Sequence, residues 1–347
     1  MTALPPRSEE ALDDQLSEPR AATVAALARA PGDIVVLGAG GKMGPTLARM
    51  AVRALQDGRA RLASRVTAVS RFGGRTSGVE ESLHEAGVET IRCDLLDRAA
   101  VASLPDAANV VFMAGQKFGT REAPSRTWMM NVVVPALCAE RYAGSRIVAF
   151  STGNVYPLVP VASGGARETD PVGPVGEYAA SCVGRERVFE HYAASKGTRV
   201  AIMRLNYAID LRYGVLTDLA VSIMDAHPIP LTMGHVNVIW QRDANRAALE
   251  LLPHASSPPL VVNVTGTTAL GVRALAERLG HRLGREPRFA GAESGDALLS
   301  DTSRMRSLLA TPEMDIETAI EWVAEWVRDG RRLLHKPTHF EARDGTF

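Results

Sequence analysis

The sequence predicts an α/β fold in which a doubly wound parallel sheet carries helices on both faces and is followed by a smaller C-terminal lobe. Short apolar runs alternate with amphipathic stretches from residue 33 onward, which is typical of such a sheet. A glycine-rich turn after the first apolar run is the second observation that favours this fold. We expect strands at residues 33–37, 65–70, 88–92, 109–113, 146–151, 199–204 and 260–264. We expect helices at residues 42–56, 79–86, 125–142, 177–194, 242–252 and 269–283.

The glycine-rich turn lies in residues 33–44, which read DIVVLGAGGKMG. Residues 34–37 are apolar enough for a strand buried on both faces, and apolar residues then recur at three- and four-residue steps, as in a helix. Residues without Cβ let backbone amides approach a pyrophosphate, which the helix N-terminus faces with partial positive charge. The alternative is a merely tight turn between a strand and a helix. We predict a dinucleotide site formed by Gly38, Gly40, Gly41, Lys42, Met43 and Gly44.

The charge and cysteine content exclude several classes of protein. Lysine plus arginine and aspartate plus glutamate both number 39, so nothing predicts binding to nucleic acid or to an anionic membrane. Small-molecule chemistry is the better expectation. Cys93, Cys138 and Cys182 are too scattered for a disulfide framework or a zinc site, so we expect no metal and a reducing cytoplasm. The chain has no apolar run of about 18 residues, and its acidic N-terminus is unlike a signal peptide.

The chain divides into three expected segments. Residues 1–30 form an N-terminal helical arm, in which residues 17–19 resemble a helix start and residues 21–30 form the helix. Residues 31–205 form the dinucleotide-binding domain. Residues 206–347 form most of a substrate-binding lobe, although strand 260–264 and its neighbouring helices return to the sheet. One apolar stripe predicts a helix near the end of this lobe, formed by Ile316, Ala319, Ile320, Val323, Trp326 and Val327.

The end of the second strand bears on which dinucleotide is bound. In folds of this kind an acidic residue there accepts hydrogen bonds from the adenosine ribose, whereas this chain has Ser70 and Arg71, with Arg75 nearby. A carboxylate would repel a 2′-phosphate, but a hydroxyl and a guanidinium bind one, so we favour NADP over NAD. The alternative is that Arg71 is a solvated loop residue. After the third strand, Asp94 and Leu95 are expected at the adenine, where Asp94 either holds the amino group or caps a helix at 97–102.

Further motifs follow the glycine turn in a fixed order. They read RCDLLD at 92–97, FMAGQKFG at 112–119, FSTGNVY at 150–156, YAASC at 178–182, RDANRA at 242–247, VVNVTG at 261–266 and DTSRMRSLL at 301–309. In this order the motifs resemble those of the extended short-chain dehydrogenase/reductase superfamily, the NAD-dependent epimerase/dehydratase family. The resemblance covers almost the whole chain from residue 33. It implies a Rossmann-type sheet and places Ala114 and Gly115 against the cofactor.

The same resemblance implies an active site made of a hydroxyl, a tyrosine and a lysine over the nicotinamide. The hydroxyl corresponds to Thr152 and the acid/base to Tyr178, which in such enzymes passes a proton while hydride moves. The alternative is an ordinary threonine and a packing tyrosine. Where the family reads Tyr-x-x-x-Lys, this chain has Cys182, which we expect to be a neutral buried thiol within this catalytic group and not a nucleophile. A free tyrosine titrates near pH ~10, so another group must compensate.

Two cations are candidates for the missing charge. Lys117 follows the fourth strand in the order Ala114-Gly115-Gln116-Lys117, and it resembles the lysine that UDP-galactose 4-epimerases place against the cofactor. Arg185 lies on the same helical face as Tyr178 but about 10 Å further along the axis. We therefore favour Lys117 as a catalytic and cofactor-binding residue. The alternative is a surface lysine.

Candidate substrate residues follow the catalytic strands. Related enzymes that bind nucleotide sugars hold the diphosphate with an asparagine after the sixth strand and an arginine in the lobe. Asn206 keeps the asparagine, but residues 233–240 contain no arginine, which argues for a smaller sugar, sugar acid or lactone. Trp240 can equally be a core residue. The substrate residues we expect are Asn154, Asn206, Tyr207, Asn237 and Trp240.

These residues predict an NAD(P)-dependent oxidoreductase or epimerase that acts on a hydroxyl or ketone of a sugar, a sugar acid or a nucleotide sugar. Because the lysine is absent, a cofactor-binding redox sensor or scaffold with little catalysis is an alternative. A lyase or dehydratase is a third possibility, although Thr152 is followed by Gly153 and Asn154 and not by the acidic pair of family dehydratases. By analogy with related proteins, helices 125–142 and 177–194 are expected to pair two subunits in a homodimer.

Overall fold

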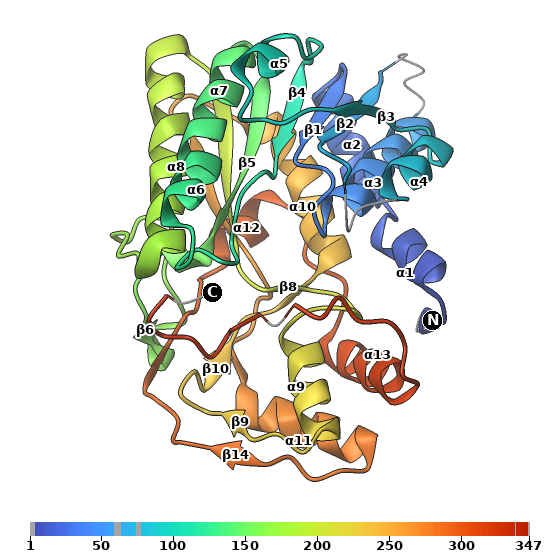
Figure 1. The fold of residues 1–347 in the computed structure, drawn as a ribbon, viewed down its shortest axis with the longest axis vertical. Helices are drawn as coiled ribbons and strands as arrows, with labels where there is room; N and C mark the ends of the chain where they lie inside the picture. The colour runs from blue at the N-terminus through green and yellow to red at the C-terminus, as the bar shows by residue number, and fades with distance from the viewer. Residues whose placement is uncertain (1–3, 59–63, 74–77, 337, 346–347) are drawn as a thin grey trace.

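A seven-stranded parallel sheet forms the centre of the molecule (Figure 1). The computed structural model describes residues 4–58, 64–73, 78–336 and 338–345. The strand order is β12-β7-β5-β4-β1-β2-β3, so the chain reverses direction across the sheet between β1 and β4. All seven predicted strands and the doubly wound fold are confirmed. The strands are β1 (Ile34–Leu37), β2 (Val66–Ser70), β3 (Glu89–Arg92), β4 (Asn109–Phe112), β5 (Arg146–Thr152), β7 (Arg199–Leu205) and β12 (Leu260–Val264).

Helices cover both faces of this sheet. One face is covered by α2 (Ala21–Arg29), α3 (Gly44–Asp57) and α10 (Gln241–Leu251), which pack on each other. The other face is covered by α5 (Arg98–Ala102), α7 (Val134–Arg141) and α8 (Gly176–Lys196). Two shorter helices lie at the edges, α4 (Val79–Glu85) beside β3 and α12 (Ser303–Leu308) beside β12.

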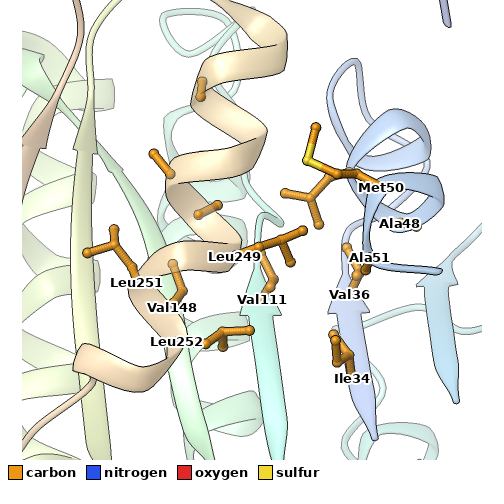
Figure 2. Packing of buried hydrophobic residues seen from close by; sticks show 14 of the residues in the cluster. Ile34, Val36, Ala48, Met50, Ala51, Val111, Val148, Leu249, Leu251 and Leu252 are labelled. Atoms are coloured by element: carbon orange, nitrogen blue, oxygen red, sulfur yellow. The ribbon is translucent and has the colours of Figure 1, made fainter. Parts of the chain in front are cut away.

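The apolar layer under α3 and α10 fixes the helix that begins at the glycine turn. Figure 2 shows Val36, Val111 and Val148 of β1, β4 and β5 near Met50 of α3 and Leu249 of α10. All five side chains are 0% exposed. Burial of an aliphatic side chain of this size stabilises the fold by about 1.5–3 kcal/mol. This packing holds the N-terminus of α3 at the carboxyl end of β1.

The predicted helix at 125–142 is interrupted by a wider turn. It consists of α6 (Pro124–Trp128), a π-helical turn (Met129–Val133) and α7. Pro135 has no N–H to donate to the carbonyl of residue 131, and its ring crowds that carbonyl, which accounts for the wider turn. Asn131, on this turn, is 0% exposed and donates from Nδ2 to Ser181 Oγ of α8 over 2.9 Å.

The N-terminal arm has two helices where the sequence predicted one. The additional helix α1 (Glu9–Leu16) begins after Ser8, whose hydroxyl accepts from Ala11 N. It escaped prediction because only Leu12 and Leu16 form its apolar face. These two leucines lie in the core of the C-terminal lobe, while α2 packs on α10. The arm therefore joins the lobe to the sheet domain.

The lobe is built on three helices that pack on each other, α9 (Val215–Met224), α11 (Val272–Leu283) and α13 (Ile316–Arg328) (Figure 1). Helix α13 carries the apolar stripe that the sequence predicted. Short strands pair around these helices: β8 (Ala208–Ile209) with β11 (Ile239–Trp240), β9 (Ile229–Pro230) with β14 (Phe289–Ala290), β10 (His235–Val236) with β13 (Leu270–Gly271), and β6 (Val159–Pro160) with β15 (Asp296–Ala297). Single 3₁₀ turns lie at Gly153–Val155, Val161–Ser163 and Leu252–His254.

After α13 the chain crosses back over the lobe as an extended C-terminal segment, residues 331–336 and 338–345 (Figure 1, red). Leu334 N donates to Arg212 O, and Thr338 donates from its backbone and hydroxyl to Asp218 Oδ2 over 2.8 and 2.6 Å. The segment ends at Gly345, which packs on the N-terminus of α8. In the part of the chain that the structure describes, no helix is both long and apolar enough to span a bilayer.

Candidate active site

A pocket of about 340 Å³ lies where the carboxyl ends of β1, β4, β5 and β7 meet the lobe. This is the point at which the strand order reverses, and open α/β sheets bind ligands at such a point. The pocket brings together twelve of the predicted site residues: Gly38, Gly41, Lys42, Met43, Gly44, Gly115, Lys117, Thr152, Asn154, Tyr178, Asn206 and Tyr207.

The glycines of the turn are required by close contacts. Gly38 has φ +87°, and a Cβ there would lie 2.6 Å from Ala114 N. A Cβ on Gly44 would lie 2.3 Å from Ala39 O, so no side chain fits where α3 leaves the turn. The predicted Gly40 lies beside the pocket, where a Cβ would meet Ser70 Oγ at 2.6 Å. The turn thus holds its backbone close to β2 and β4, with the N-terminus of α3 at the pocket.

Lys42 points from this turn to the lobe. Its Nζ donates to Ala208 O over 2.9 Å, lies 4.0 Å from Asp210 Oδ2 and sits 4.3 Å from the centre of the Tyr213 ring. Burial lowers the pKa of Lys42 to about 8, against the opposing effect of Asp210. Lys42, which the sequence predicted at the cofactor, therefore joins the glycine turn to the lobe across the pocket.

The residues predicted for the adenosine lie next to the turn and outside the pocket. Ser70 ends β2, its carbonyl accepts from Cys93 N over 3.0 Å, and Arg71 follows on the exposed surface. Arg75 lies outside the described residues. Among the described residues, β2 ends with Ser70 and not with a carboxylate.

The helix at 97–102 is capped by Asp97 and not by Asp94. Asp97 Oδ1 accepts from Ala99 N and Ala100 N, whereas Asp94 Oδ1 accepts only from Leu96 N over 3.1 Å. Leu95 is 6% exposed and belongs to the core under α5 and α7. Of the two predicted roles of Asp94, the cap is thus wrong, because Asp97 is nearer the first amides of α5.

Thr152 and Tyr178 are hydrogen-bonded to each other in the pocket. Thr152 ends β5 and Tyr178 lies in the first turn of α8. The single Thr152 hydroxyl proton is donated to Asn154 Oδ1 over 2.8 Å, while Asn154 N donates back over 3.2 Å. The hydrogen bond to Thr152 lowers the pKa of Tyr178 and so favours its phenolate form. Both side chains line the pocket, where the carboxyl end of β5 meets the first turn of α8.

Cys182 lies behind Tyr178 and is 0% exposed. Burial raises the pKa of this thiol, while the nearby Arg185 guanidinium and Tyr178 lower it less. Burial also raises the pKa of Tyr178, to which Cys182 adds, while Arg185 and the bond to Thr152 oppose the rise. A neutral thiol thus stands one helical turn from the phenol. Arg185 acts on both groups, and Lys117 and Glu186 also act on the thiol.

The side chain of Arg185 lines the pocket. Its distance from Tyr178 along the helix axis had argued against this position. Its Nη1 donates to Phe150 O and its Nη2 to Asn131 Oδ1, both over 2.8 Å. Side chains on a helix tilt toward its N-terminus, so a long arginine covers much of the separation from Tyr178. Asn131 was missed by the sequence analysis, although Pro135 in its helix is a signal of the turn that presents it.

Lys117, the favoured cation, also lines the pocket. Burial lowers its pKa to about 8, opposed by Asp218 and by Cys182. Its Nζ donates to Thr338 O over 3.4 Å, so the C-terminal segment contributes to the site. Leu334, Lys336 and Thr338 of that segment line the pocket as well. Nothing in the sequence pattern of these residues indicated this position.

The predicted substrate residues are divided between the pocket and the lobe core. Asn206 and Tyr207 line the pocket, where Tyr207 has φ +41° and its hydroxyl donates to Phe340 O over 3.5 Å. Asn237 lies elsewhere and joins Thr268 O to Ser300 N. Trp240 packs edge to face on Trp322 in the lobe core. Neither Asn237 nor Trp240 is in the described lining of the pocket: the Asn237 amide is hydrogen-bonded within the lobe, and Trp240 Nε1 donates to Gln15 Oε1 of α1.

A buried ion pair joins the elements that carry Thr152 and Tyr178. Glu186 of α8 accepts from Arg204 of β7 over 2.6 and 3.0 Å, and from Ser151 Oγ of β5 over 2.5 Å. Arg204 also donates to Tyr156 OH over 2.6 Å. The network fixes α8 against β5 directly behind the pocket.

The model of the NAD dependent epimerase/dehydratase family matches residues 34–210, more than half of the chain. Similar solved structures include Pal from Bacillus thuringiensis, which is 18% identical with a TM-score of 0.70 over 86% of this chain and 100% of that chain. UDP-glucose 4-epimerase from Thermotoga maritima is 18% identical with a TM-score of 0.68 over 86% and 99%. The dTDP-glucose 4,6-dehydratase of Streptomyces venezuelae, solved with NAD bound, is 20% identical with a TM-score of 0.70 over 86% and 97%. No curated protein sequence matches the chain.

Proposed function

The chain belongs to the NAD-dependent epimerase/dehydratase family, and we propose that it transfers hydride between a nicotinamide dinucleotide and a carbohydrate-like hydroxyl or ketone. The observation that carries this proposal is the hydrogen bond between Tyr178 and Thr152 in the pocket that begins at the glycine turn. Either net oxidation or reduction, or epimerisation through a transient ketone, is compatible with this arrangement.

The proposed chemistry moves one hydride and one proton. The bound nicotinamide supplies or accepts the hydride at the carbon that carries the oxygen. In reduction, Tyr178 gives its proton to the oxygen as the C–H bond forms, and in oxidation its phenolate takes that proton. Thr152 then turns its hydroxyl from Asn154 Oδ1 to the same oxygen and donates a hydrogen bond to it. The turn and the N-terminus of α3 would bind the pyrophosphate through backbone amides.

We propose NADP as the preferred cofactor, with NAD as the alternative. Two features support it: Ser70 in place of a carboxylate at the end of β2, and the exposed Arg71 that follows. A guanidinium binds a 2′-phosphate through charge-assisted hydrogen bonds, and no acidic group there repels it. Competition between the two dinucleotides for the purified chain tests this choice.

The charges at the pocket favour an acidic substrate such as a sugar acid. Its described lining contains the cations Lys42, Lys117, Arg185 and Lys336 and no aspartate or glutamate. Such a lining attracts a carboxylate or phosphate. The absence of arginine from residues 233–240 favours a substrate smaller than a nucleotide sugar.

The experiment that tests the proposal combines binding with turnover. NADP and NAD are titrated into the purified chain, which is then mixed with sugar acids, neutral sugars, polyols and nucleotide sugars. Reduced nicotinamide is followed by absorbance, and epimerisation by product analysis. We expect saturable binding and turnover that falls by about 10²- to 10⁴-fold in Tyr178→Phe. Failure to bind either dinucleotide would refute the proposal.

A second candidate is a dinucleotide-binding protein with little or no catalysis. Cys182, which is neutral and buried beside Tyr178, favours this reading. Saturable cofactor binding with no turnover of the whole panel, and no effect of Tyr178→Phe on binding, would support it.

A further inference from the structure

Arg185 is a buried cation without a carboxylate partner in the described part of the chain. It is 6% exposed, its two terminal nitrogens donate to Phe150 O and Asn131 Oδ1, and its Nε has no hydrogen-bond partner there. Its Cζ lies 5.7 Å from the centre of the Phe112 ring. An unpaired buried charge destabilises a fold, whereas Glu186, the next residue, is fully paired with Arg204. Packing alone therefore gives no reason for a guanidinium at this position.

The surrounding backbone leaves room for this guanidinium. A Cβ on Gly115 would lie 2.4 Å from Arg185 Nη2 and 3.0 Å from Asn131 Oδ1. Gly115 thus lets the loop after β4 pass over the charged group, while Asn131 on the π-helical turn holds it in place. Three separate elements, the loop after β4, the π-helical turn and α8, converge to fix one positive charge beside Tyr178.

We propose that Arg185 supplies the positive charge that Tyr178 needs in order to exchange a proton near neutral pH, and that the neutral Cys182 makes space for it. Arg185 acts through Tyr178 and is a positioning residue, so the inference rests on the proposed function. The guanidinium already lowers the pKa of both the phenol and the thiol against the larger effect of burial. A second cation at position 182 would repel it, which explains a small uncharged residue there.

Other charged and titratable groups face Tyr178 and belong to any account of its pH dependence. On α8 these are Cys182 and Arg185. From the loop after β4, the glycine turn, the lobe and the C-terminal segment, the pocket receives Lys117, Lys42, Tyr207, Tyr213 and Lys336. Arg185 lowers the pKa of both Tyr178 and Cys182, and Lys117 lowers the pKa of Cys182.

The first test follows the rate as a function of pH. Arg185→Gln is expected to lower turnover at neutral pH at least tenfold and to move the limb set by Tyr178 to higher pH, by one pH unit for each factor of ten. Arg185→Lys keeps the charge and should retain most of the activity. Gly115→Ala should shift the profile in the same direction as Arg185→Gln, because its Cβ displaces Nη2. Arg187→Gln, which alters an exposed arginine of the same helix, is the matched control and should change nothing.

Two results of this experiment would overturn the proposal. One is a fall in rate for Arg185→Gln with the pH limb unmoved, which indicates a merely structural role. The other is a pH–rate profile whose Tyr178 limb moves in Lys117→Gln but stays in place in Arg185→Gln. That result would assign to Lys117 the positive charge that acts on Tyr178. Cofactor binding by the unaltered chain is measured in parallel, because its absence refutes the proposed function instead.

The second test needs no substrate. Cys182→Lys is made in the native chain and in Arg185→Gln, and the midpoint of urea unfolding is compared in the two backgrounds. We expect the lysine to lower the midpoint more in the native chain, where two cations compete for one site. Equal shifts would contradict the proposal. Where turnover is available, Cys182→Lys should also restore at least part of the rate lost in Arg185→Gln.

Discussion

The buried pair Glu186–Arg204 gives the sharpest prediction about stability. Glu186 is 1% and Arg204 5% exposed, and two hydrogen bonds of 2.6 and 3.0 Å join them. Ser151 Oγ donates to the same carboxylate, and Arg204 donates to Tyr156 OH, which in turn donates to Asn263 Oδ1. The perturbation is Glu186→Gln, which keeps the shape of the side chain and removes its charge.

The magnitude follows from the cost of the charge left behind. Arg204 would keep its positive charge in a site with almost no access to water, and removing one partner of a buried ion pair costs about 3–5 kcal/mol. The free energy of unfolding of a domain is about 5–15 kcal/mol, so the variant loses a large part of it. Replacing both residues by apolar ones, as in Glu186→Leu with Arg204→Met, should cost much less, because no buried charge is then unpaired.

The assay is urea unfolding followed by circular dichroism, with Glu190→Gln as the matched control. Glu190 pairs with Arg187 over 2.6 Å on the same helix, but the two side chains are 34% and 61% exposed. Water screens such a pair, so its loss should cost roughly 0.5 kcal/mol or less. A loss of less than about 1 kcal/mol for Glu186→Gln, close to that of Glu190→Gln, would refute the reasoning.

Three further predictions concern cofactor choice, the burial of Lys42 and the C-terminal segment. Arg71→Ala should weaken NADP binding by about 1 kcal/mol and leave NAD binding unchanged in equilibrium titrations; equal losses would argue against a 2′-phosphate contact. Folding lowers the pKa of Lys42 from 10.5 to about 8, so the unfolded chain binds the extra proton between these values and the free energy of unfolding rises with pH from about 8 to 10.5. In urea unfolding at several pH values, Lys42→Met should remove part of this rise. An unchanged dependence of the free energy of unfolding on pH would contradict the burial of the Lys42 ammonium. Asp218→Ala removes both hydrogen bonds to Thr338, each about 1.5–3 kcal/mol when the acceptor is charged, so limited proteolysis should cut the C-terminal segment faster. An unchanged cleavage rate would show that other contacts hold the segment.

The sheet was predictable because its strands are buried on both faces. Such strands appear in the sequence as continuous apolar runs, and each predicted run overlaps an observed strand. The pattern weakens after residue 205 because the strands of the lobe are only two residues long and are too short to show a period. Helix α1 was missed for a related reason, since two buried leucines give little periodic signal.

The site was predictable where it depends on local sequence. Gly38 follows from the glycine turn after the first strand, whereas Thr152 and Tyr178 follow from motifs that resemble those of the family. The structure brings all three to one pocket. The sequence analysis did not favour Arg185 as the cation near Tyr178, because the distance along a helix axis ignores the length and direction of the side chain. Trp240 was expected at the substrate because sequence alone does not distinguish a core tryptophan from one in a pocket.

The position of the C-terminal segment depends on tertiary structure alone. Asp218 holds it from α9, and Lys117 contacts it from the loop after β4, so its position is set by residues more than one hundred positions away. No local pattern encodes such a contact. Its presence at the pocket makes the C-terminal end of the chain part of the site.

The proposed function requires that a nicotinamide dinucleotide bind at the glycine turn with its reactive ring beside Tyr178. The most direct measurement is an equilibrium titration of the purified chain with reduced dinucleotide, in parallel with Gly38→Ala. A Cβ at position 38 would lie 2.6 Å from Ala114 N on a backbone with φ +87°. We predict one saturable site per native chain and its loss in Gly38→Ala. A native chain that binds no dinucleotide, or a variant that binds it equally well, would contradict the claim.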